Sequence, residues 1–175
     1  MTQLEEVLTG REERAKKQRE LLGHGTFILQ IILNIPGWPK HLDGEEKVIV
    51  KFHNYFIKSF SIKPKDETIF ANGAGLCCLM LFDGSKADAL RAKLLSVKLE
   101  EEKRGGRLVD MDVIAKDGII SRTDLKLPQR KCIVCSNSAK SCAQSQAHTL
   151  EEVRAAAEKI ASDFISKKET NNAAR

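Results

Sequence analysis

The chain has 175 residues, of which 42% are hydrophobic and 30% charged, a composition that suits one soluble domain with a packed core. The net charge of +5 favours anionic partners, although the basic residues do not form one block. No segment approaches the ~20 apolar residues of a membrane helix, and the N-terminus lacks the features of a signal peptide. We therefore expect a cytoplasmic protein whose cysteines are thiols or metal ligands.

Good helix formers fill residues 3 to 22 and predict an N-terminal helix that stops at Gly23. This helix is expected to lie on the surface of the domain, because its apolar stripe is thin. The apolar, β-branched run from 27 to 33 predicts a buried strand. Residues 44 to 60 have a helical apolar period. The expected stripe of the first helix is Leu4, Val7, Leu8 and Leu22.

Residues 68 to 70 and 76 to 82 predict two strands joined by a glycine-rich turn. A second amphipathic helix follows, and then a strand over 107 to 115 with a short return strand over 119 to 122. The apolar stripe predicted for this second helix consists of Ala87, Leu90, Leu94 and Val97.

Thr149 and Glu152 have the spacing of a capping box and predict the start of a final helix. The polar residues from about 169 to 175 are expected to fray. The resulting order, α-β-α-β-β-α-β-β-loop-α, predicts a single α+β domain over residues 1 to 175, with a mixed or antiparallel sheet covered by helices.

A pair of carboxylates, Asp110 and Asp112, lies two positions apart in a predicted strand. Because side chains alternate along a strand, both face the same side and can bind one Mg²⁺ against substrate phosphates. Gly105 and Gly106 would let the backbone approach an anion, and Arg107 would offer a two-pronged phosphate partner. The alternative is an ordinary strand with a wet polar face.

A second cluster of reactive side chains, Cys132-x2-Cys135-x6-Cys142-x5-His148, gathers three thiols and an imidazole within 17 residues. Its C-x2-C start is typical of zinc sites, whereas the complete spacing matches no standard zinc motif. Three interpretations remain: a structural Zn²⁺ site, a set of small buried thiols beside a helix-entry histidine, or a general base at His148.

Basic residues surround both clusters and could ring a polyphosphate, or they could simply form a solvated surface. We expect Arg107, Arg122 and Arg130 to bind the phosphates. The full set is Lys103, Arg104, Arg107, Arg122, Lys126, Arg130 and Lys131.

A long ordered set of residues resembles the citrate lyase holo-acyl-carrier-protein synthase family, the apo-citrate lyase phosphoribosyl-dephospho-coenzyme A transferases. The similarity is dense over residues 106 to 148 and collinear elsewhere, including the N-terminal Leu8-x-x-Arg11-Glu12-x-Arg14-x-x-x-Gln18. The matching positions are Gly106-Arg107-Leu108-x-Asp110-x-Asp112-Val113, Ser121-Arg122, Arg130-x-Cys132-x-x-Cys135, Ala139, Cys142 and His148.

The resemblance implies a transfer reaction in which a serine of the citrate lyase acyl carrier protein attacks triphosphoribosyl-dephospho-coenzyme A. Pyrophosphate leaves, and a phosphodiester joins the prosthetic group to the carrier. The chain departs from the family pattern at 73 to 75, at 103 to 106 and at Gln144, where the family often has other residues.

Two other functions share parts of these patterns. A zinc-knuckle nucleic-acid binder would stack bases on aromatic side chains, but none occurs between Phe82 and Phe164. A polymerase-like nucleotidyltransferase would carry a Gly-Ser element ahead of its carboxylates, for which Gly105 and Gly106 are a poor substitute.

Overall fold

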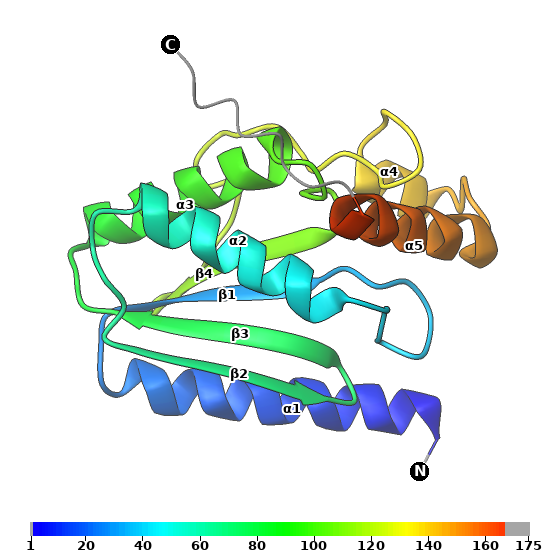
Figure 1. Ribbon diagram of the computed structural model, residues 1–175. Coiled ribbons are helices and arrows are strands. Elements are labelled where there is room, and N and C mark those ends of the chain that lie inside the picture. Colours follow the sequence, from blue (N-terminus) through cyan, green and yellow to red (C-terminus); the bar gives the residue numbers. More distant parts are fainter. Residues whose placement is uncertain (1, 167–175) are drawn as a thin grey trace.

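The computed structural model describes residues 2–166 and shows one five-stranded sheet with helices on both faces (Figure 1). Neighbouring strands are all antiparallel, in the order β2-β3-β1-β4-β5, which confirms the predicted α+β class. The predicted frayed tail lies outside the described residues. The strands are β1 (Phe27–Leu33), β2 (Asp66–Asn72), β3 (Gly75–Phe82), β4 (Val109–Ala115) and β5 (Gly118–Ile120), and the helices are α1 (Gln3–Leu22), α2 (Glu45–Ser59), α3 (Lys86–Glu102), α4 (Ala139–Gln144) and α5 (Leu150–Ser166).

The sheet separates two apolar cores. Helices α2, α3 and α5 cover one face, where the larger core contains Phe27, Phe52 and Phe82, and α1 covers the other (Figure 1). All eight residues of β3 are buried, because both faces of this strand are covered. Each helix within residues 2–166 is too short or too polar to span a bilayer.

Helix α1 is a surface helix, as predicted, but its apolar stripe does not make the main contact. Leu4 and Leu8 are 67% and 46% exposed. A Cβ atom on Gly10 would lie 2.4 Å from the backbone nitrogen of Ala74, so the helix approaches the β2–β3 turn closely. The Arg14 guanidinium donates to the Ala74 carbonyl at 2.9 Å. The turn offers backbone acceptors, and a small residue and an arginine therefore fit it better than leucines do.

Helix α3 buries a face that only partly agrees with the predicted stripe. Val97 is buried and Leu90 half-buried, but Leu94 is 47% exposed and Ala87 is also exposed, whereas Lys93 and Glu100 are buried. The apolar period gave the helix but misplaced part of its buried face, because two buried positions are charged. Their partners lie on the edge of β4, which a helical period cannot reveal.

Several local features also differ from the prediction. Strand β4 begins at Val109 and not at residue 107, because Leu108 N–H donates to Gly105 in a tight turn. Strand β5 ends at Ile120, where Asp124 accepts hydrogen bonds from Ser121. The short helix α4 was not predicted, since its six residues, capped by Ser138, are too few to show a period.

Candidate active site

Strand β4 presents two different faces, as its alternation predicts. Val109, Met111 and Val113 are buried in the larger core, whereas Asp110 and Asp112 point to the opposite face and are only partly buried. In register, Asp110 lies beside Ile32 and Asp112 beside Gln30 of β1. Helix α1 covers the same face of the sheet but contacts mainly β1 and β3. The two carboxylates on β4 lie beside this helix and stay partly exposed to solvent.

The first half of β4 has no neighbouring strand on its outer side, because β5 pairs only with Val113–Ala115. Side chains complete the missing hydrogen bonds. Glu100 Oε1 accepts from Met111 N–H at 2.7 Å, and Lys93 Nζ donates to the Met111 carbonyl at 3.0 Å. Arg130 donates to the carbonyl of Val109. The two charged residues on the buried face of α3 thus take the place of a strand.

The same side chains form an ion-pair network that includes both aspartates. Asp112 Oδ1 lies 3.3 Å from Lys93 Nζ, and Asp110 Oδ1 lies 3.5 Å from Arg130 Nη2. Burial raises the pKa of Asp110; Arg130 opposes this shift and the nearby Asp112 carboxylate adds to it. The Asp112 carboxylate is therefore near enough to affect the ionisation of Asp110.

Glu100 stands at the centre of this network. It lies 2.6 Å from Arg122 Nη2 and 3.9 Å from Arg130 Nη2. Burial raises the pKa of Glu100, and the two guanidinium groups oppose that shift. Lys93 and Glu100 were missed in the sequence; the available signal was a lysine and a glutamate spaced i, i+7 on a helix face otherwise occupied by small apolar residues.

The three predicted phosphate-binding arginines fall into two groups. Arg107 and Arg130 line two cavities, of about 630 Å³ and about 260 Å³, that adjoin at these residues and at Lys131. Arg122 lines only the smaller cavity, and Glu100, Glu101 and the Pro128 carbonyl all accept hydrogen bonds from it. Arg122 therefore holds the local structure together, whereas Arg107 and Arg130 line both cavities while also donating to the carbonyls of Cys132 and Val109.

Two other basic residues of the predicted ring lie elsewhere. Lys103 Nζ sits 4.8 Å from the centre of the Tyr55 ring, and Arg104 donates to the carbonyls of Asp163 and Phe164. These contacts attach the end of α3 to α2 and α5.

The glycines ahead of β4 form a tight turn. A Cβ atom on Gly106 would lie 2.2 Å from the Glu100 carbonyl oxygen, and one on Gly105 would lie 2.8 Å from the Phe164 ring. Gly105 also has a φ of +84°, which favours glycine. On these sides the backbone approaches protein atoms, although Gly106 also lines the smaller cavity.

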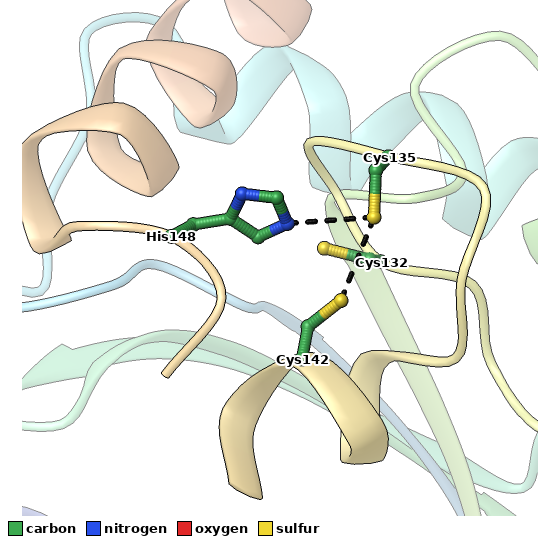
Figure 2. Close-up of side chains that lie close together, drawn as sticks. All are labelled: Cys132, Cys135, Cys142 and His148. Atoms are coloured by element: carbon green, nitrogen blue, oxygen red, sulfur yellow. Dashed lines mark hydrogen bonds between the residues drawn. The ribbon is translucent and has the colours of Figure 1, made fainter. Parts of the chain in front are cut away.

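The three cysteines and His148 converge on one point, and we call them the Cys/His cluster (Figure 2). Cys132 follows a bridge between Lys131 and Ser138, Cys135 lies in the loop, Cys142 is on α4, and His148 precedes the capped start of α5. All four ligand atoms lie within 4.8 Å of one another. The Nε2 atom of His148 points at the Cys135 sulfur, at 3.4 Å (Figure 2).

The thiols of the cluster have opposite acid–base shifts. Burial raises the pKa of Cys132, but hydrogen bonds from the backbone of Cys135 and Val134 and from neighbouring thiols outweigh it and lower the pKa to about 7. A hydrogen bond with Cys135, with burial, raises the pKa of Cys142 to about 12. In the absence of a metal, Cys132 is therefore the thiol that loses its proton more readily, and Cys142 keeps its proton.

Comparisons with known proteins agree with the resemblance noted in the sequence. The family described as apo-citrate lyase phosphoribosyl-dephospho-CoA transferase matches residues 2–164. A probable transferase of this name from Vibrio cholerae is 29% identical over 92% of each chain, and one from Streptococcus pyogenes is 31% identical over 94% of this chain and 88% of its own. Protein CitXG from Haemophilus influenzae is 34% identical over 86% of this chain and 33% of its own length. The chain belongs to the apo-citrate lyase phosphoribosyl-dephospho-CoA transferase family.

Proposed function

We propose that this protein transfers the phosphoribosyl-dephospho-CoA group to apo-citrate lyase. The family match over residues 2–164 carries this conclusion. The acceptor would be a serine of the citrate lyase acyl carrier protein, and the donor triphosphoribosyl-dephospho-CoA. The serine oxygen attacks the phosphorus next to the ribose, a P–O bond to pyrophosphate breaks, and the serine proton leaves to a base or to water. The reaction forms a phosphodiester.

Arg107 and Arg130 are the proposed ligands of the triphosphate. Both line the two adjoining cavities, and the larger, at about 630 Å³, has the size of a small-molecule site. A planar guanidinium offers paired donors to phosphate oxygens and keeps its charge at all physiological pH values. Lys131 lies at the same junction and adds a third positive charge.

Asp110 and Asp112 are the proposed ligands of Mg²⁺. Their residue type, spacing and partial exposure fit this ion, which binds through one or two carboxylates together with substrate phosphates. When bound, Mg²⁺ would offset negative charge on the transferring phosphoryl group and the departing pyrophosphate. Arg130 connects the carboxylates to the cavities, because it pairs with Asp110 and lines both cavities.

The protein is proposed to act in the cytoplasm. All five cysteines are free thiols, which suits a reducing compartment.

Transfer is tested with the purified chain, the apo form of the citrate lyase acyl carrier protein and triphosphoribosyl-dephospho-CoA. Intact-mass spectrometry should show the carrier gaining the phosphoribosyl-dephospho-CoA mass, with pyrophosphate released in equal amount. Arg130→Lys should slow transfer, whereas Arg91→Lys, a matched change at an exposed residue of α3 that lines neither cavity, should not. An unmodified carrier in the presence of folded protein and Mg²⁺ would exclude the proposal.

A further inference from the structure

Two ligand pairs of the Cys/His cluster have separations close to those of a tetrahedral zinc site. With Zn–S bonds of about 2.3 Å and Zn–N bonds of about 2.0 Å, tetrahedral geometry places two sulfurs ~3.8 Å apart and a sulfur and nitrogen ~3.5 Å apart. The Cys135 and Cys142 sulfurs are 3.5 Å apart, and His148 Nε2 is 3.4 Å from the Cys135 sulfur. All four ligand atoms lie within 4.8 Å of one another, and the four side chains come together from three separate parts of the chain (Figure 2).

The segment that carries the cluster buries few apolar side chains, and arginine side chains make most of its bonds to the rest of the domain. Between Ser121 and Thr149, only Cys132 and Cys142 are buried. The backbone bonds there are local, such as Cys132 N–H to Asn137 and Ala147 N–H to Cys142. So few buried apolar side chains offset only part of the conformational entropy lost on ordering such a long loop, and a metal cross-link would add to the hold of Arg122 and Arg130.

The surroundings of the cluster suit bound zinc. Three thiolates and a neutral imidazole around Zn²⁺ carry one net negative charge. Arg107 Nη1 lies 3.4 Å and 3.5 Å from the carbonyl oxygens of Cys132 and Cys135, so a positive charge stands beside the cluster. The backbone N–H of Val134 donates to the Cys132 sulfur at 3.4 Å, a bond that favours a thiolate.

We propose that Cys132, Cys135, Cys142 and His148 bind one structural Zn²⁺, which joins the loop, α4 and the start of α5. The thiols lose their protons on binding. Four protein ligands leave no open position for substrate, so the ion has a structural role. It fixes the wall of the larger cavity, to which Cys132, Cys142 and His148 all contribute. His148 is then a metal ligand and not the general base.

The test is elemental analysis of the full chain, purified without a histidine tag and without chelator. We expect about one zinc per chain in the wild type, and loss of most of it in Cys142→Ser. Cys78→Ala is the matched control, because it removes a buried thiol outside the cluster and should keep the zinc. Zinc content is measured independently of transfer activity, so this proposal and the proposed function can fail separately.

A second measurement covers the case in which Cys142→Ser does not fold. Wild-type protein produced with Co²⁺ should show the intense thiolate-to-cobalt absorption and the visible bands of a tetrahedral site, and added Zn²⁺ should remove both. Folded wild-type protein that contains no zinc and takes up no Co²⁺ would overturn the proposal. So would a disulfide between Cys135 and Cys142 in protein purified without a reductant.

Discussion

Substitutions of Glu100 test whether side chains replace a neighbouring strand along the free edge of β4. The Glu100 carboxylate accepts from the buried Met111 N–H at 2.7 Å and from Arg122 at 2.6 Å, and its side chain is only 4% exposed. Changing Glu100 to alanine removes the acceptor of a buried backbone N–H. Changing it to glutamine keeps the shape and one carbonyl oxygen for Met111, but removes the charge.

The contacts set the size of the expected effects. A buried N–H without an acceptor costs about 1–3 kcal/mol. Breaking a buried ion pair costs about 3–5 kcal/mol when the remaining charge has no other partner. Arg122 keeps Glu101, at 2.7 Å, so the second cost is only partial. We expect Glu100→Ala to lower the free energy of unfolding by about 3 kcal/mol.

Glu100→Gln should cost less than alanine, about 1–2 kcal/mol, because its amide oxygen can still accept from Met111 N–H although Arg122 loses a charged acceptor. Burial raises the pKa of Glu100. A raised folded pKa means that the carboxyl group contributes stability below its unfolded pKa and loses this contribution as the pH rises through its folded pKa. Glutamine does not titrate. Between about pH 7 and about pH 4, acidification should therefore shift the stability difference in favour of the wild type.

Urea denaturation followed by circular dichroism, at several pH values, gives the free energy of unfolding of the wild type and of the alanine and glutamine variants. The reasoning is refuted if glutamine is as destabilising as alanine at neutral pH. It is also refuted if acidification shifts the stability difference in favour of the glutamine variant.

Four further variants test the active site and the turn that precedes β4. Asp110→Asn and Asp112→Asn should each lower turnover at least ~10²-fold with the fold intact, and near-normal transfer by both would remove the pair from the mechanism. Arg107→Lys should raise the KM for triphosphoribosyl-dephospho-CoA about tenfold, since lysine lacks the planar fork; an unchanged KM with a lower Tm would instead show a structural arginine. Gly106→Ala places a methyl group 2.2 Å from the Glu100 carbonyl oxygen. It should lower stability by about 1–3 kcal/mol, and an unchanged melting temperature by calorimetry would contradict the packing of this turn.

Local sequence patterns determined the elements whose cause is local. The apolar run of β1 and the helical period of α2 predicted both elements closely, and Thr149 and Glu152 form the predicted capping box at the start of α5. The alternation in β4 placed Asp110 and Asp112 on one face. Family membership also followed from the sequence, because an ordered set of motifs is specific even when each motif alone is not.

Tertiary structure decided which charged residues are buried and what they bind. Lys93 and Glu100 lie on the buried face of α3 because the outer edge of β4 needs a donor and an acceptor there. This edge is unpaired because β5 pairs only with the last three residues of β4, which the sequence alone does not indicate. The same holds for Arg122, whose partners are carboxylates of α3. A local pattern records the period of one element, whereas the partner of a buried charge lies on another element and is set by packing.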